Sequence, residues 1–174
     1  LYLTDNKEAP SFFTPQMEKF KNFSKSSQVL TFLGKSDFGC KTKCNVQRLG
    51  DLLGTCYHRV VLPSISNQNL PTPPADCEYR VKWTQAPGFA LIKSISLKIG
   101  ETLIDKQYGE FLQIWNDLID NNEIKRGMTG NTRSVDEPLT EHAEITLYIP
   151  LKFWFCSDPT KFLPLIALQY HNVT

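Results

Sequence analysis

The stretch Ile145-Thr-Leu-Tyr-Ile-Pro-Leu-Lys-Phe-Trp-Phe155 decides the fold class, because apolar residues occupy every second position in it. A period of two is the pattern of a β-strand that buries one face in a core. Asp158 and Pro159 then supply turn chemistry, and Leu163-Pro-Leu-Ile-Ala-Leu-Gln-Tyr-His171 resumes the apolar run. We therefore expect a closing hairpin of two strands built from large apolar side chains.

Short strands separated by turns are predicted along much of the remaining chain. The expected strands cover residues 26–33, 38–48, 56–62, 89–99 and 102–105, with turns at 34–37 and 100–101. Residues 64–87 and 121–140 contain several Pro, Gly and Asn residues and are expected to be loops. Eleven Pro and eleven Phe in a chain of 174 residues also favour an all-β domain rich in turns.

The period changes over residues 108–119, where the apolar side chains recur at helical spacing. They are Tyr108, Phe111, Leu112, Trp115, Leu118 and Ile119. This spacing places them on one stripe of an amphipathic helix. We expect the stripe to pack against one end of the β-sandwich.

Length and composition exclude several classes of protein. A chain of 174 residues favours a single domain. Its 19 basic and 18 acidic residues leave no dominant positive field, so direct binding of nucleic acid is not expected. No apolar run approaches the roughly 18 residues that span a bilayer, and residues 1–10 lack the pattern of a signal peptide.

The cysteines are predicted to be reduced thiols, because they are odd in number and scattered through the expected strands: Cys40, Cys44, Cys56, Cys77 and Cys156. This usage favours the cytosol over an oxidising compartment. Cys40 and Cys44 are close in sequence, but on one strand face they lie about 13 Å apart, too far for one metal ion to bridge. We expect half-buried thiols there.

No catalytic, cofactor-binding or metal-binding residue is predicted. His58, His142 and His171 are far apart in the sequence and form no metal-binding spacing, which argues against a metalloenzyme. Asp105 and Glu110 flank the start of the expected helix, and paired carboxylates can act on sugars. We prefer the simpler interpretation that their negative charge favours the positive end of the helix dipole.

The first third of the chain is locally basic. Residues 1–24 combine charged and aromatic side chains and are expected to form an arm that packs on a partner. The basic residues are Lys19, Lys21, Lys25, Lys35, Lys41, Lys43 and Arg48. They could face an anionic membrane or nucleic acid, and a solvated strand face explains them equally.

Five motifs, in order, resemble the major capsid protein of nucleocytoplasmic large DNA viruses in its N-terminal jelly roll. They are Tyr2-Leu-Thr4 with Phe12-Phe13; Arg48-Leu-Gly-Asp-Leu52; Ile95-Ser-Leu-Lys-Ile-Gly-Glu-Thr-Leu-Ile-Asp105; Tyr148-Ile-Pro-Leu151 with Phe153-Trp-Phe155; and Leu163 to His171. The chain departs from the family pattern at Asp5-Asn6-Lys7, and at Glu101, where the family has a second Gly.

The resemblance implies a jelly-roll β-sandwich, the first barrel of a double jelly-roll protein. Residues 1–24 would be the arm, and residues 25–174 an incomplete N-terminal jelly roll. Homotrimers would form pseudo-hexagonal capsomers that contact neighbouring capsomers and minor capsid proteins. The basic arm would face these proteins or an internal membrane, in a virion assembled in the host cytoplasm.

Two other functions fit a jelly roll. A lectin-like module would cluster exposed aromatic and carboxylate side chains in one sugar-binding groove. An enzyme on this scaffold would need histidines that converge on a metal ion, and the spacing of the three histidines disfavours it. We expect the loops 64–87 and 121–140 to carry contacts between subunits or exterior decoration.

Overall fold

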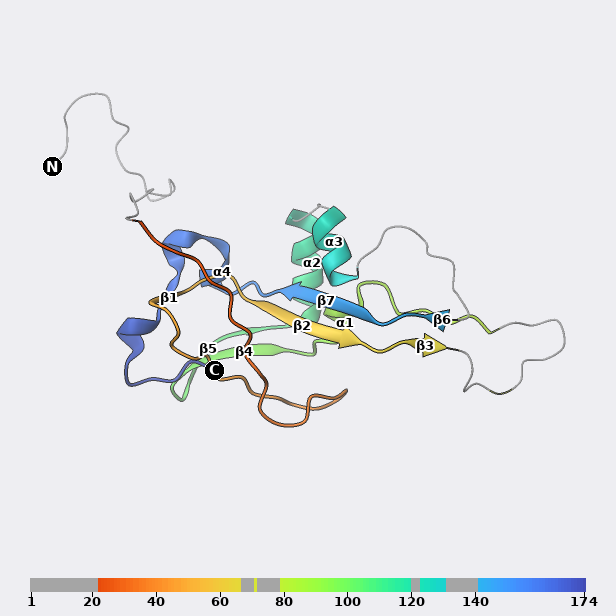
Figure 1. Cartoon of the computed structure of the whole chain (residues 1–174), viewed down its shortest axis with the longest axis horizontal. Helices are drawn as coiled ribbons and strands as arrows, with labels where there is room; N and C mark the ends of the chain where they lie inside the picture. The colour runs from red at the N-terminus through yellow and green to blue at the C-terminus, as the bar shows by residue number, and fades with distance from the viewer. Residues whose placement is uncertain (1–21, 67–70, 72–78, 120–122, 131–140) are drawn as a thin grey trace, which may run out of the picture.

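The computed structural model describes residues 22–66, 71, 79–119, 123–130 and 141–174 (Figure 1). The strands are β1 (Leu52–Leu53), β2 (Tyr57–Leu62), β3 (Ile65–Ser66), β4 (Ile95–Ile99), β5 (Thr102–Gln107), β6 (Glu141–His142), β7 (Ile145–Pro150) and β8 (Leu163–Pro164). The helices are α1 (Pro87–Ala90), α2 (Gly109–Ile119), α3 (Glu123–Thr129) and α4 (Trp154–Ser157), with 3₁₀ helices η2 (Pro159–Lys161) and η3 (Leu165–Leu168).

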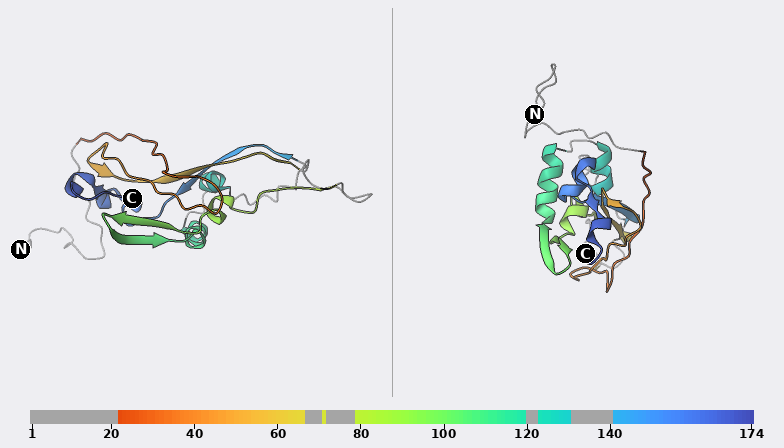
Figure 2. Two further views of the ribbon diagram at one scale, coloured as in Figure 1. Left: turned by 90° about the horizontal axis from the view of Figure 1, so that it is seen from below. Right: turned by 90° about the vertical axis from the view of Figure 1, so that its left-hand side faces the viewer.

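Two antiparallel pairs of strands form the two layers of the molecule. β2 pairs with β7 from Tyr57 opposite Pro150 to Leu62 opposite Ile145, and β3 with β6 continues the same ribbon. β4 and β5 form a hairpin with a register shift between Leu97 and Lys98. In the left view of Figure 2 the β4–β5 hairpin lies below the β2–β7 ribbon, as in a β-sandwich.

The last residues of the chain extend the β4–β5 layer. Lys98 and Thr174 exchange two backbone hydrogen bonds, with N–O distances of 2.8 and 3.0 Å. On the other side of this segment, the Val46 N–H donates to the carbonyl of Val173 at 2.9 Å. The C-terminal segment therefore lies between β4 and the chain near Val46, and residues distant in sequence close this layer.

Among the described residues, most of the buried hydrophobic side chains form two groups. One group packs β4 against the C-terminal segments and consists of Leu97, Phe153, Phe155, Leu163, Leu165 and Val173. The other packs α1 and α2 against β7 and consists of Ala86, Phe89, Leu112 and Ile149. β7 follows the predicted alternation, since Leu147 and Ile149 are fully buried while Thr146 and Tyr148 are exposed.

The predicted closing hairpin is wrong beyond Pro150. β7 ends there, α4 follows, and β8 pairs with β1, Leu53 opposite Leu163, instead of with β7. Pro150 and Pro164 donate no backbone hydrogen bond, which discourages a continuous ladder. Burial of both Phe153 and Phe155 in one core group outweighs the alternating pattern. Only the expected turn is confirmed, because the Asp158 side chain accepts a hydrogen bond from the Thr160 N–H at 3.0 Å.

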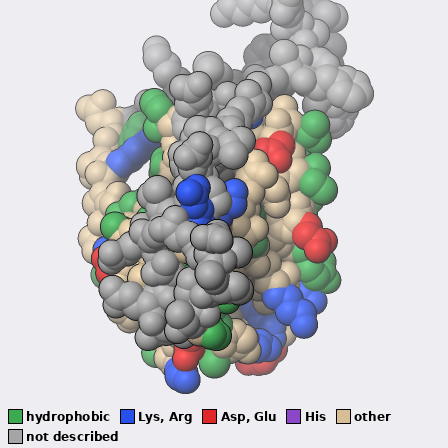
Figure 3. Space-filling model, turned by 90° about the vertical axis from the view of Figure 1, so that its right-hand side faces the viewer, with side chains coloured by type: hydrophobic (Ala, Val, Ile, Leu, Met, Phe, Trp, Pro, Cys, Tyr) green, Lys and Arg blue, Asp and Glu red, His purple; other side chains and the backbone are tan. Residues whose placement is uncertain are grey.

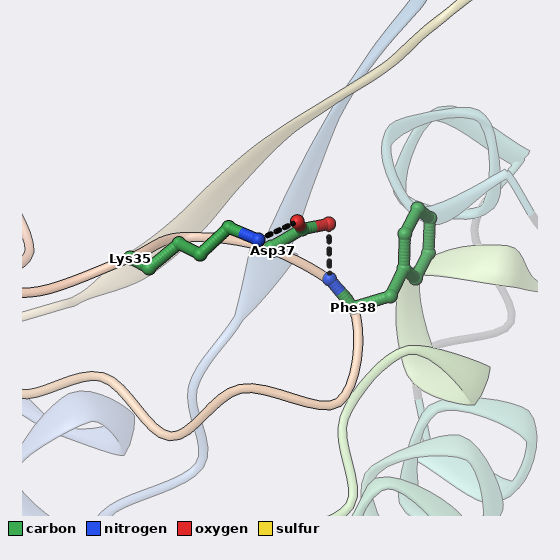
Figure 4. A network of polar contacts seen from close by, with 3 residues as sticks. All are labelled: Lys35, Asp37 and Phe38. Atoms are coloured by element: carbon green, nitrogen blue, oxygen red, sulfur yellow. Dashed lines mark hydrogen bonds and ion pairs between the residues drawn. The ribbon is translucent and has the colours of Figure 1, made fainter.

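The predicted strands 26–33 and 38–48 are also wrong. They meet only at one bridge, Leu33 opposite Lys43, because most of their side chains are exposed and provide no apolar face. The turn between them is confirmed (Figure 4). There the Lys35 Nζ lies 2.8 Å from Asp37, and the Phe38 N–H donates to the same carboxylate at 2.8 Å. These contacts, that of Lys35 first, lower the pKa of Asp37.

Other predicted elements are confirmed in part. β2 matches the strand expected at 56–62, and the hairpin around residues 100–101 is correct. The strand expected at 89–99 is shorter than predicted and forms only β4 (Ile95–Ile99). Its expected beginning is helical, because Pro87 starts α1 and the buried Phe89 belongs to that helix. The expected loop 64–87 contains β3, and the expected loop 121–140 contains the helix α3. Residues 67–70, 72–78, 121–122 and 131–140 of these loops lie outside the described residues.

Candidate functional site: the outward face of α2

The position of α2 depends on a close contact at its first residue. A Cβ atom on Gly109 would lie 2.3 Å from the carbonyl oxygens of both Phe89 and Ile92, so only glycine allows this approach. Glu110 follows in the first turn, where the helix dipole favours negative charge. The buried residues of α2 are Gly109, Leu112 and Asn116, which form one narrow inward line.

The predicted apolar stripe of α2 faces outward, apart from Leu112. We name this surface the α2 face; its residues are Tyr108, Phe111, Ile114, Trp115, Leu118 and Ile119. Leu118 is 78% exposed and Ile119 is 60% exposed. Of the predicted stripe, only Leu112 is fully buried, so the expectation that the stripe packs on the sandwich holds for that residue and not for the exposed ones. Helical spacing identified five residues of the α2 face, missed Ile114, and placed the exposed side chains in the wrong environment.

The strand that leads into α2 also carries exposed apolar side chains. Leu103 and Ile104 of β5 are about half exposed, and β5 leads directly into α2. The right view of Figure 2 shows α2 standing above the β4–β5 hairpin along one edge of the molecule. Within the face the rings of Phe111 and Trp115 lie 5.8 Å apart. Contiguous exposed apolar surface of this kind marks interaction sites.

The candidate catalytic residues do not converge. His58 lies in β2 with its ring 5.2 Å from that of Phe32, His142 lies in β6, and His171 lies near the C-terminus. Burial lowers the pKa of His58. Among the described residues, no cluster of three or more potential metal ligands occurs.

The two carboxylates expected at the start of the helix, Asp105 and Glu110, have different surroundings. Asp105 accepts a hydrogen bond from the Gln107 side chain at 3.0 Å within β5. Glu110 lies in the first turn of α2, the position that the helix-dipole interpretation requires.

Some of the described basic residues of the first third, Lys25, Lys35 and Arg48, contact their own chain. The Arg48 guanidinium donates to the carbonyls of Leu168 at 2.6 Å and His171 at 3.2 Å. The Lys25 Nζ lies 5.7 Å from the ring centroid of Phe23. Lys19 and Lys21, in the expected arm, lie outside the described residues. Arg48 therefore secures the C-terminal segment, which sequence reasoning did not anticipate.

One face of the molecule carries charged side chains of both signs. On the face in Figure 3, the Lys and Arg side chains are interspersed with Asp, Glu and hydrophobic side chains. The described helices include none that is long and apolar enough to cross a membrane.

Comparison with known proteins identifies the family. Residues 11–174 match the family described as "Major capsid protein N-terminus". The chain belongs to this capsid protein family. It is 35% identical to the major capsid protein of Chrysochromulina ericina virus and 37% identical to that of Pyramimonas orientalis virus, over 99% of the chain in both cases. These alignments cover 37% and 42% of the two relatives, so the chain spans well under half of their length.

Solved capsid structures share the fold. The chain matches PBCV-1 VP54, fitted into a reconstruction of the virophage Sputnik, with a TM-score of 0.72 and 30% identity over 94% of the chain. A structure of the PBCV-1 virus capsid gives the same values, and each match covers 36% of the known chain. The all-β jelly-roll prediction is confirmed by this similarity.

Two of the capsid-family motifs meet in the structure. In the motif 48–52, Arg48 binds the carbonyls of Leu168 and His171, and the Asp51 carbonyl accepts from the Leu165 N–H at 2.9 Å. β1 pairs with β8 beside these bonds. The motif 163–171 is therefore joined to the motif 48–52, and not to β7 as the hairpin prediction required. The motif 95–105 forms the β4–β5 hairpin, with Gly100 at a φ of 62°.

Sequence reasoning missed a second feature, the pair Cys56 and Cys156. Both sulfur atoms approach the carbonyl oxygen of Gly54, at 3.5 and 3.8 Å. The hydrogen bond between the two thiols raises the pKa of Cys56 and lowers that of Cys156. Cys56 and Cys156 are brought together by the pairing of β2 with β7. The hydrogen bond from the Leu151 N–H to the Cys56 carbonyl extends this pairing by one residue beyond Tyr57 and Pro150. No local spacing could have revealed this contact.

Proposed function

We propose that this chain is the N-terminal jelly roll of a major capsid protein that builds the shell of a large icosahedral double-stranded DNA virus. The observation that carries the proposal is the family match over residues 11–174, together with the 0.72 TM-score to a capsid protein at 30% identity. The protein acts through packing and not through catalysis. The matched relatives and structures are capsid proteins, which favours this function over sugar binding by a lectin-like module.

The assembly that we propose follows from the family. Three copies of the full-length protein form a pseudo-hexagonal capsomer, and capsomers contact one another and the minor capsid proteins in the virion shell. Assembly takes place in the host cytoplasm. Residues 1–24 act as the basic arm toward minor capsid proteins or an internal membrane, residues 25–174 form part of the first jelly roll, and nucleic acid is not a direct partner.

The α2 face is our candidate for a contact between neighbouring copies. It is apolar, and α2 carries Glu110 and Asp117 but no Lys or Arg. The chain between residues 22 and 49 carries the opposite charge together with exposed apolar side chains such as Phe23 and Phe38. Two different but complementary surfaces on one chain favour a heterologous contact, which closes into a ring when the rotation is suitable. A trimeric capsomer is such a ring.

The test is the oligomeric state of the full-length protein. Native mass spectrometry should give a mass three times that of the subunit, and electron microscopy should show ring-like particles. A monodisperse monomer at micromolar concentration that binds sugars on a glycan array would contradict the proposal and restore the lectin-like alternative.

A further inference from the structure

Cys56 and Cys156 lie at a junction that holds several segments together. Cys56 directly precedes β2, and Cys156 lies in α4. Both are half-buried and pack against the core group that contains Phe153 and Phe155. The Leu151 N–H donates to the Cys56 carbonyl at 3.0 Å, and the Cys156 N–H donates to that of Phe153 at 2.9 Å. The backbone around each thiol is therefore fixed by its own hydrogen bond.

The two sulfur atoms are held close to each other. Each lies within hydrogen-bonding distance of the single carbonyl oxygen of Gly54, at 3.5 Å for Cys56 and 3.8 Å for Cys156. The two thiols also influence each other's pKa: the interaction raises that of Cys56 and lowers that of Cys156. The Phe162 ring packs closely against Gly54, since a Cβ atom at that position would lie only 2.8 Å from the ring. In a disulfide the two sulfur atoms lie about 2.05 Å apart, so the bond requires both side chains to turn from the shared carbonyl oxygen toward each other.

We propose that Cys56 and Cys156 form a disulfide when the folded protein meets a low-molecular-weight disulfide. In the structure both are free thiols. The bond would join the start of β2 to α4 and close a loop through most of the described elements. Cross-links that close long loops stabilise a fold most, because they restrict the unfolded chain.

The chemistry is a two-step thiol–disulfide exchange with glutathione disulfide as the oxidant. The Cys156 thiolate attacks one sulfur of glutathione disulfide, and the first glutathione leaves as a thiolate. The Cys56 thiol then loses its proton and attacks the Cys156 sulfur of the mixed disulfide, which expels the second glutathione. Two protein thiols are oxidised, one glutathione disulfide is reduced to two thiols, and the two protons pass to the leaving thiolates.

Cys156 is suited to the first attack. The hydrogen bond from Cys56 and the nearby charge of Lys152 lower the pKa of Cys156, although burial opposes them. The thiolate is the reactive form of cysteine. The interaction with Cys156, together with burial, raises the pKa of Cys56. The exchange balances in the same way when Cys56 attacks first and Cys156 resolves the mixed disulfide.

The setting in which this bond matters rests on the proposed capsid function. A capsid protein made in a reducing cytosol keeps free thiols during assembly. Disulfides persist on virion surfaces outside the cell, where conditions are oxidising. The shell subunit would therefore gain its cross-link after assembly and release.

The experiment treats the full-length protein with glutathione disulfide, then alkylates free thiols and maps the peptides by mass spectrometry without reduction. We expect a Cys56–Cys156 cross-linked peptide, and a rise in Tm on the order of 10 °C that dithiothreitol reverses. Cys156→Ser should lose the rise, whereas the control Cys40→Ser, at an exposed thiol, should keep it.

Two results would overturn the proposal. They are alkylation of both thiols after treatment, and a cross-link from either thiol to Cys44. If Cys156→Ser does not fold, the peptide map of the unchanged protein decides alone. A cross-link in a protein that stays monomeric would count against the capsid function and not against the disulfide.

Discussion

At the scale of single residues, Gly109 controls the contact between α2 and α1. A Cβ atom there would lie 2.3 Å from two carbonyl oxygens, and neither oxygen belongs to a flexible side chain. Gly109→Ala should therefore lower the free energy of unfolding by about 1–3 kcal/mol, the usual cost of overpacking. Gly127→Ala is the matched control, because it also lies in a helix and a Cβ atom there would meet nothing within 4 Å. The control should stabilise by about 0.5–1 kcal/mol through helix propensity. Urea denaturation measures both, and equal effects would contradict the close approach.

His58 should make stability depend on pH. Burial lowers its pKa in the folded state below the ordinary value of 6.5. Between these two values the unfolded chain binds more protons than the folded chain, so stability rises with pH in this window and falls as pH drops below about 6.5. His58→Gln should remove this part of the dependence while leaving the rest. The measurement is urea unfolding at a series of pH values from 5 to 8, and identical slopes for the two proteins would refute the assignment.

At the scale of elements, two leucines of α2 test which side of the helix faces the core. Leu112 is fully buried and Leu118 is 78% exposed. Leu112→Ala should cost about 2–5 kcal/mol of unfolding free energy, as for a core leucine. Leu118→Ala on the same helix should change the unfolding free energy of the monomer by less than about 0.5 kcal/mol. Thermal or urea unfolding at low protein concentration compares them, and a cost at Leu118 similar to that at Leu112 would place the α2 face inside the fold.

The same elements show what the sequence could and could not predict. The β2, β4, β5 and β7 strands and the α2 helix carry local periodicity, and all were predicted with shifted ends. α4 was missed because Phe153 and Phe155 are both buried in one core group, a tertiary effect that no period encodes. The strand predicted at 163–171 is only β8, and it pairs with β1 and not with β7. The environment of the α2 face was mispredicted for a similar reason. Periodicity predicts which side chains share one face of a helix. Whether another part of the structure covers that face depends on tertiary and quaternary packing, which periodicity does not encode.

At the scale of the whole molecule, the α2 face should govern assembly and not folding. Its apolar side chains remain exposed on the described chain, and isolated proteins seldom leave such patches uncovered. Leu118→Glu adds a negative charge at the most exposed residue of the face, on a helix that already carries Glu110 and Asp117, so it should oppose docking. Because Leu118 does not contact the core, the Tm of the monomer should change by no more than about 2 °C.

The matched control for this substitution is Tyr170→Glu, which adds the same charge at an apolar side chain that is 93% exposed and lies outside the α2 face. In the full-length protein, Leu118→Glu should weaken association of subunits by about tenfold or more, as loss of a central interface contact does. Tyr170→Glu should assemble like the unchanged protein. Analytical ultracentrifugation across a concentration series gives the association constants. If both variants associate normally, the α2 face is not a contact between neighbouring copies. If association is weakened equally in both variants, the added negative charge is responsible and not the position of Leu118.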